Sequence, residues 1–267
     1  MELKEKPDAL IFDVDGVLLD VSRSFPEVIR QTILNGWVKF CGGISDSKGY
    51  TEEHEYIMKR HGAFNDDYDL AWALLSISAA SGSKKLSEAF PSPRHLEKEV
   101  ETFNGTVESW VHSRYGDLVP RRESRVMCND LYFGDGKTRG LHCLETPMVH
   151  CHWSRLPLAV GLYTGRDIPE LTAGEEMLEW QDFPLDNVVH SESGVCKPSP
   201  EGLEILCEHF GAKNPIFFGD TASDYLAYEA FGRGYFAAIG SLLPEAEYKF
   251  KDTEEALAKL INFRTGS

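Results

Sequence analysis

The chain has 267 residues, of which 42% are hydrophobic and 26% are charged, and its formal net charge is −16. This composition is ordinary for a globular protein, and the length allows one large domain or two smaller ones. Such an acidic chain is not expected to bind nucleic acid or an anionic membrane, so an anionic ligand would need a local positive field.

The start of the chain, MELKEKPDAL, lacks the apolar stretch of a signal peptide. No apolar run reaches the roughly 18 to 20 residues that a helix needs to cross a bilayer. The six cysteines follow no regular spacing, which favours reduced thiols. We therefore expect a cytoplasmic protein.

The first predicted element is a strand over residues 9–12, which ends in the acidic pair of LIFDVDGVLLD. Side chains two residues apart in a strand point the same way, so the carboxylates of Asp13 and Asp15 would crowd one face. Their repulsion would be costly unless a cation lay between them. Gly16 would then let the chain turn past this site.

A long, mainly helical stretch follows this strand, far longer than one crossover helix requires. Helix starts are indicated at Ser24, as a capping box in SFPE, and at Thr51, Asp66 and Ser92. Apolar residues at helical spacing over 96–111 predict one long helix that ends at a glycine. We expect it to pack in the core of this stretch or against the rest of the chain, with a dimer contact as the alternative. We expect an inserted helical domain over 21–154, with the rest of the chain, 1–20 and 155–267, forming the core domain.

After the insert, near-continuous apolar runs predict further buried strands at 158–163, 188–190, 216–218 and 235–239. Segments of helical length alternate with them, at 169–180, 200–210, 223–231 and 253–261. This alternation predicts an α/β fold with a doubly wound parallel sheet and right-handed crossovers.

Polar motifs follow four predicted elements at the edge where an open α/β sheet binds ligands. Each motif alone is more typical of an ordinary turn or helix start, but four in this order indicate a site. They are Asp13-Val14-Asp15-Gly16, Thr164-Gly165-Arg166, Lys197 in CKPSP, and Gly219-Asp220-Thr221-Ala222-Ser223-Asp224.

The chemistry of these groups suits a phosphoryl-transfer site. Mg²⁺ prefers oxygen ligands, which Asp13, Asp220 and the main-chain carbonyl of Asp15 would supply. The Asp13 carboxylate would attack phosphorus to form an aspartyl phosphate, while Asp15 would serve as general acid and then as general base. Thr164 and Lys197 would stabilise the developing negative charge.

The remaining motif residues would support these groups. Asp224, one helical turn after Asp220, would orient Lys197 or the surroundings of the metal. Gly165 and Gly219 are supporting residues beside Thr164 and Asp220. Arg166 is expected at the surface or at a helix start.

The motif set resembles the haloacid dehalogenase superfamily, and the insert after the first motif resembles the helical cap of its phosphoglycolate phosphatase-like branch. The segments HGAFNDDYDL and LYFG resemble an uncharacterised group of that branch. This resemblance implies that Asp13 is the nucleophile and Asp15 the acid/base, and it carries over Thr164, Lys197, Asp220 and Asp224 motif by motif. The insert is longer than the usual cap, so the resemblance implies no particular substrate.

The sequence therefore predicts a Mg²⁺-dependent phosphatase that acts on a small phosphorylated metabolite, as a monomer or homodimer. A phosphomutase of the same family is an alternative, and so is a non-catalytic phosphoacceptor or binding module. Cysteines and histidines gather between 128 and 152, but their spacing matches no strong zinc pattern, so surface or core roles are favoured. They are Cys128, His142, Cys143, His150, Cys151 and His152.

Overall fold

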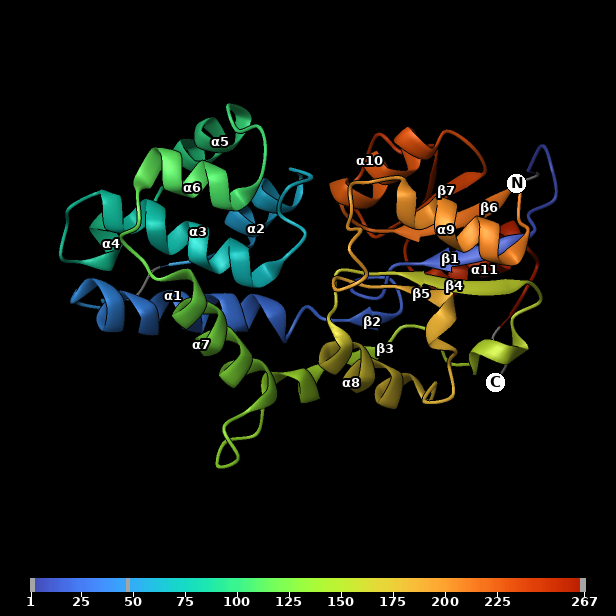
Figure 1. The fold of residues 1–267 in the computed structure, drawn as a ribbon, viewed down its shortest axis with the longest axis horizontal. Helices are drawn as coiled ribbons and strands as arrows, with labels where there is room; N and C mark the ends of the chain where they lie inside the picture. Colours follow the sequence, from blue (N-terminus) through green and yellow to red (C-terminus); the bar gives the residue numbers. More distant parts are fainter. Residues whose placement is uncertain (1–2, 47–48, 265–267) are drawn as a thin grey trace. The chain divides into compact units, whose positions relative to one another are not determined.

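The structure is a computed structural model that describes residues 3–46 and 49–264. The chain forms two compact units, one of residues 1–21 and 145–267 and the other of residues 22–144. Residue 21 and residues 145–154, which we expected to lie in the insert, belong to the first unit. Both units are drawn as ribbons in Figure 1.

The first unit contains a parallel sheet with the strand order β5-β4-β1-β6-β7-β8. The predicted strands are confirmed with small shifts at their ends, whereas β8 was missed. The strands of this sheet are β1 (Ala9–Phe12), β4 (Ala159–Tyr163), β5 (Val188–Val189), β6 (Pro215–Gly219), β7 (Tyr235–Ile239) and β8 (Tyr248–Phe250).

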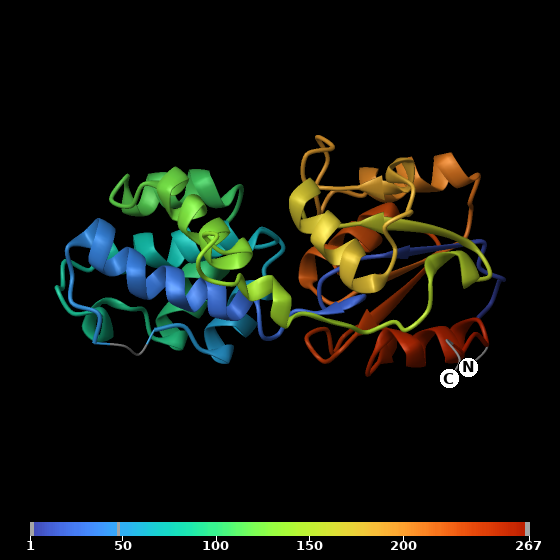
Figure 2. The same ribbon diagram turned by 90° about the horizontal axis from the view of Figure 1, so that it is seen from below.

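Helices cover both faces of this sheet, as the ribbon views show (Figures 1 and 2). Leu10 and Phe12 point to the face that packs against α8 and α11, while Ala9 and Ile11 point to the face that packs against α9 and α10. The four helices are α8 (Ile168–Leu178), α9 (Glu201–Phe210), α10 (Ala222–Phe231) and α11 (Thr253–Leu260). These layers confirm the predicted doubly wound α/β fold.

The strand order places a topological switch point at β1. Strand β1 lies between β4 and β6, and the chain continues from β4 to one edge of the sheet and from β6 to the other. The strands are parallel, so their carboxyl ends share one edge, and open α/β sheets bind ligands at such a point. A separate antiparallel pair, β2 (Leu19–Asp20) and β3 (Thr146–Pro147), joins the two chain segments next to the insert. Short 3-10 turns, η2 (Trp153–Arg155) and η3 (Leu185–Asn187), connect other elements.

The second unit is helical and is built around α3, which is buried along most of its length. A helix that is apolar all round needs neighbours on every side, and α1, α6 and α7 pack against it. The helices of the unit, with one 3-10 turn, are α1 (Phe25–Cys41), α2 (Glu52–Lys59), α3 (Asp67–Ala80), α4 (Leu86–Ala89), α5 (Pro93–Glu101), α6 (Val107–Tyr115), α7 (Arg121–Phe133) and η1 (Leu141–Leu144).

Two predictions for this unit were wrong in detail. The single helix expected over 96–111 is broken into α5 and α6, because Gly105 adopts a φ of 109° and Thr106 caps a new helix through Ser109 N–H. The apolar positions along both helices are nevertheless buried, as expected. Ser24 precedes α1 without the predicted capping-box hydrogen bond. Asp66, by contrast, caps α3 as predicted.

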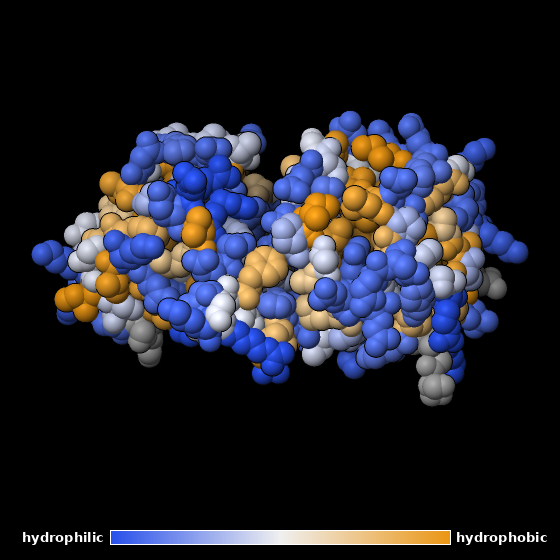
Figure 3. Space-filling view, turned by 60° about the horizontal axis from the view of Figure 1, so that its bottom comes forward, coloured by the Kyte–Doolittle hydropathy of each residue, from blue (hydrophilic) through white to orange (hydrophobic). Residues whose placement is uncertain are grey.

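The surface is mainly hydrophilic on the face drawn in Figure 3, with hydrophobic residues scattered among polar ones. Among the described residues, exposed large hydrophobic side chains come from separate elements, such as Val38, Leu118, Ile205 and Leu226. No helix in the described ranges is long and apolar enough to span a membrane.

Candidate active site

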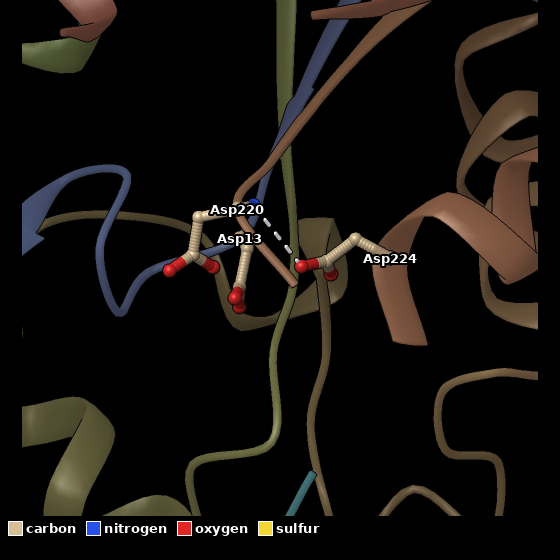
Figure 4. Close-up of side chains that lie close together, drawn as sticks. All are labelled: Asp13, Asp220 and Asp224. Carbon is tan, nitrogen blue, oxygen red and sulfur yellow. Dashed lines mark hydrogen bonds between the residues drawn. The ribbon is translucent and has the colours of Figure 1, made fainter. Parts of the chain in front are cut away.

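Three carboxylates gather at the switch point of the sheet (Figure 4). Asp13 follows β1, Asp220 follows β6, and Asp224 lies in the first turn of α10. One oxygen atom of each lies within 4.8 Å of the others. The register brings the first two together, since β1 pairs with β6 and Asp13 N–H donates to the carbonyl of Phe218 at 2.9 Å.

Lys197 supplies the positive charge of this group. Its ammonium lies 2.8 Å from Oδ1 of Asp13 and 2.7 Å from Oδ1 of Asp224, and all three side chains are almost fully buried. Burial alone would lower the pKa of Lys197, but the charges of Asp13 and Asp224 outweigh it and raise that pKa above its usual value. Lys197 therefore remains protonated over the physiological range of pH.

The pKa of Asp13 is also raised, but here burial is the largest cause. Burial raises the pKa of Asp13 above its usual value, Lys197 opposes that shift, and the nearby carboxylates of Asp224 and Asp15 add to it. A single ammonium group thus lies among several carboxylates. The protein alone therefore does not balance the negative charge of the cluster. Additional positive charge at this point would favour the ionised form of Asp13.

Both carboxylate oxygens of Asp224 accept hydrogen bonds, most of them from the loop after β6. Its Oδ1 accepts a hydrogen bond from Lys197, while its Oδ2 accepts from the N–H groups of Asp220 and Thr221 and from the Thr221 hydroxyl. The bond from Thr221 N–H is one half of a capping box at the start of α10, and the Asp224 N–H donates to the Thr221 side chain in the other half. Asp224 therefore contacts both Lys197 and the backbone of Asp220.

Two glycines leave space for these carboxylates. Gly16 has a φ of 70°, and a Cβ added there would lie 2.1 Å from Oδ2 of Asp220. A Cβ on Gly219 would lie 2.4 Å from the Cβ of Asp224. The glycine after the DxD pair is thus required both by the turn and by the carboxylate that rests against it.

Thr164 follows β4, the strand on the other side of β1. It is buried, its N–H donates to the carbonyl of Val189 at 2.9 Å, and its hydroxyl accepts from Arg166 N–H at 3.2 Å. A hydroxyl that accepts a bond through its oxygen still has a proton to donate. Gly165 lies half-buried between Thr164 and Arg166.

The expectation for Arg166 was wrong as to exposure. Its side chain is completely buried and binds Oδ1 of Asp15 through Nε at 2.9 Å and Nη2 at 2.6 Å. Nη2 also donates to Glu145 at 2.8 Å. Sequence reasoning missed this contact because an arginine after a strand is usually solvated, and nothing in the sequence around Glu145 indicates a buried acid.

The cysteines and histidines of 128–152 do not come together. Cys128 is buried beside Thr32, whereas His150 contacts Glu254 and His152 contacts Asp182. Among the described residues, the cluster suited to a metal is the one of Asp13, Asp220 and Asp224. These partners support the surface and core roles that the sequence favoured.

The sequence pattern of the haloacid dehalogenase-like hydrolases matches residues 7–232. The chain belongs to this family. None of the curated proteins matches the sequence. The family membership confirms the resemblance drawn from the motifs and identifies the chain as a hydrolase.

Solved structures agree with the family assignment. The chain is similar to the phosphatase Tt82 from Thermococcus thioreducens, with 27% identity and a TM-score of 0.64, over 93% of this chain and 97% of that one. It is similar in fold to a subfamily IA hydrolase of the superfamily from Geobacter sulfurreducens, with 18% identity and a TM-score of 0.52, over 95% and 100% of the two chains. A predicted phosphoglycolate phosphatase from Haemophilus somnus shares the fold at 14% identity and a TM-score of 0.51, over 96% and 98%.

Proposed function

We propose that this hydrolase is a Mg²⁺-dependent phosphatase that cleaves a small phosphorylated metabolite through an aspartyl phosphate on Asp13. The observation that carries the proposal is the position of Asp13, buried at the switch point with Lys197 at 2.8 Å and Asp220 beside it. The phosphatase from Thermococcus thioreducens, similar over most of its length, supports the reaction class.

The donor set fits a hard divalent cation. Carboxylate oxygens are the ligands that Mg²⁺ prefers, and the acids here exceed the positive charge that the protein supplies. Asp13 and Asp220 would hold the ion, together with the main-chain carbonyl of Asp15, because the oxygens of Asp224 are already engaged. The ion, when bound, would neutralise charge on the phosphoryl oxygens and so let an anionic nucleophile approach.

Side chains of the protein carry out the remaining steps of the reaction. A carboxylate oxygen of Asp13 attacks phosphorus, and the bond from phosphorus to the ester oxygen breaks. Lys197 and the Thr164 hydroxyl stabilise the charge on the transferring group. Protonated Asp15 gives its proton to the leaving oxygen. The Asp15 carboxylate then takes a proton from the water that hydrolyses the intermediate and restores Asp13.

Phosphate release from a panel of phosphomonoesters tests the proposal. We expect release in the presence of Mg²⁺, loss of release with a chelator, and a protein mass increased by one phosphoryl group in acid-quenched samples. Asp13→Asn should abolish both the release and the mass increase. Asp186→Asn, which changes an exposed acid of the same unit, serves as the matched control.

The outcomes separate the alternatives. A folded wild-type protein that binds Mg²⁺ but releases no phosphate from any ester would overturn the phosphatase assignment. Formation of an isomeric phosphate ester instead of free phosphate would indicate a phosphomutase. A stable phosphorylated protein without turnover would indicate a phosphoacceptor module. Full activity in Asp13→Asn would remove Asp13 as the nucleophile.

A further inference from the structure

A buried arginine contacts the predicted acid/base residue. The side chain of Arg166 is inaccessible to solvent, and both Nε and Nη2 donate to the same oxygen, Oδ1 of Asp15. The Asp15 side chain is 29% exposed, and Oδ2 has no hydrogen-bond partner among the residues that the structure describes. One oxygen of Asp15 is therefore fixed by the protein, and the other is available to a ligand.

Several other groups of the first unit contact this guanidinium or leave space for it. Nη1 donates to the carbonyl of Glu170 in the first turn of α8, and Nη2 donates to Glu145, whose side chain is also inaccessible. Gly174, on the same helix, would place a Cβ only 2.9 Å from Nη1. Glycine is unfavourable inside a helix, so its presence there is explained by the space that Arg166 needs.

The charge balance links Arg166 to both acids. A buried guanidinium is costly unless its donors are paired, and here the donors toward Asp15 and Glu145 are charge-assisted. Glu145 immediately precedes β3, which pairs with β2 a few residues after Asp15. The arginine thus ties the turn that carries Asp15 to the segment where the chain re-enters the first unit.

We propose that Arg166 is a positioning residue that holds Oδ1 of Asp15, so that Oδ2 exchanges the proton with the leaving group and with water, and that Glu145 holds Arg166. This inference rests on the proposed phosphatase reaction. The proton on Oδ2 moves to the ester oxygen as the phosphorus–oxygen bond breaks, and the leaving group departs as an alcohol. The Oδ2 carboxylate oxygen then accepts a proton from the attacking water.

Leaving groups of different acidity test the role. An alkyl phosphate needs a proton on its leaving oxygen, whereas p-nitrophenyl phosphate does not, because nitrophenolate is a stable anion. In single-turnover measurements we expect Arg166→Lys to slow phosphoenzyme formation from the alkyl ester about 100-fold, the lower end of general acid contributions, but from the nitrophenyl ester less than about fivefold. Glu145→Gln should show the same selectivity with a smaller loss.

Gly174→Ala provides a variant that is expected to fold. Alanine is the better helix former, but its Cβ displaces the tip of Arg166. We expect the same selective loss with alkyl esters. Thr172→Ala, on the exposed side of α8, is the matched control and should leave the rates with both esters unchanged.

A double-mutant cycle separates positioning from general structural damage. In an Asp15→Asn background, Arg166→Lys should cause no further selective loss, because the group through which it acts is gone. Equal slowing with both esters, or the full loss repeated in Asp15→Asn, would overturn the proposal. An inactive wild type would instead contradict the phosphatase function, so the two failures are distinguishable.

Discussion

At the scale of single residues, the site is a balance of buried charges. Lys197 lies between the carboxylates of Asp13 and Asp224, and removal of Asp224 would break one of these buried ion pairs together with its hydrogen bonds to the loop after β6. Breaking a buried ion pair from one side typically costs about 3 to 5 kcal/mol. Variants of Asp224 should therefore lose stability as well as activity.

Gly16 offers the sharpest test at this scale. We expect Gly16→Ala to lower the affinity for Mg²⁺ and the rate of phosphate release by at least about tenfold, because the new Cβ would displace the carboxylate of Asp220. A left-handed φ for alanine should also cost about 1 to 2 kcal/mol of stability. Isothermal titration with Mg²⁺ and the steady-state rate measure the first effect, and urea unfolding measures the second.

Gly211→Ala is the control for backbone strain. Gly211 has a φ of 66°, close to the 70° of Gly16, but no atom lies within 4 Å of the added Cβ. This variant should lose a similar amount of stability and keep its affinity for Mg²⁺. If both variants keep that affinity, Asp220 does not depend on Gly16 for its position.

At the scale of elements, helix α8 carries a buried acid whose ionisation should make stability depend on pH. Glu170 closes the capping box with Asp167, and burial raises its pKa to about 8, with the charge of Asp167 adding to that shift. Because the folded state favours protonated Glu170, its contribution to stability is complete below the usual pKa of 4.5 and is lost as the pH rises through 8.

The substitution Glu170→Gln should remove this loss of stability at high pH. Glutamine can close a capping box but cannot ionise, so the variant should lose less stability than wild type between pH 5 and pH 9. One pKa unit corresponds to about 1.4 kcal/mol, so the difference should amount to a few kcal/mol. Urea unfolding at the two pH values measures it, and Glu176→Gln, an exposed change on the same helix, is the control. Parallel losses in wild type and Glu170→Gln would contradict the assignment.

The same elements show why some features could be predicted from sequence and others could not. Strand β1 and helix α3 were predictable because apolar runs and an N-cap at Asp66 are local signals. The proximity of Asp13, Asp220 and Asp224 was predictable because the first two directly follow strands and the third lies in the first turn of a helix. The helix break at Gly105 was not predicted because the helical spacing of apolar residues continues across it. Strand β8 was not predicted because a short edge strand has too few residues to show an apolar run.

The contact between Arg166 and Glu145 was not predictable for a different reason. It joins two residues of different segments that no local pattern links, and neither residue type is expected to be buried. Only the pairing of β2 with β3 brings the segment of Glu145 beside the turn of Asp15. Such contacts depend on tertiary structure, and they are the part of the site that the motifs did not reveal.

At the scale of the whole molecule, the proposed catalytic groups and the insert belong to different compact units. All six motif residues lie in the first unit, which has its own core on both faces of the sheet. The second unit interrupts that core only between β2 and β3, where Asp20 pairs with Thr146. Two chain ends that are paired in one small sheet can be joined by a short turn.

We therefore predict that residues 22–144 can be replaced by Asn-Gly. In the sequence Asp20-Val21-Asn-Gly-Glu145-Thr146, Val21 and Glu145 would extend the antiparallel pair, and Asn-Gly favours a two-residue type I′ turn. The shortened protein should fold, gain thermal stability from Mg²⁺, and hydrolyse p-nitrophenyl phosphate. Circular dichroism, melting with and without Mg²⁺, and nitrophenolate release measure these properties.

Selectivity should distinguish the shortened protein from the full chain. Nitrophenyl phosphate needs little beyond the phosphoryl site, so its hydrolysis should persist, whereas kcat/KM for the best metabolite of the panel should fall further if the insert takes part in substrate selection. The same excision with Asp13→Asn should be inactive. If the shortened protein fails to fold, the first unit depends on the insert for stability. If it folds and binds Mg²⁺ without activity, the insert contributes to the reaction itself, and the catalytic residues in the first unit are not sufficient.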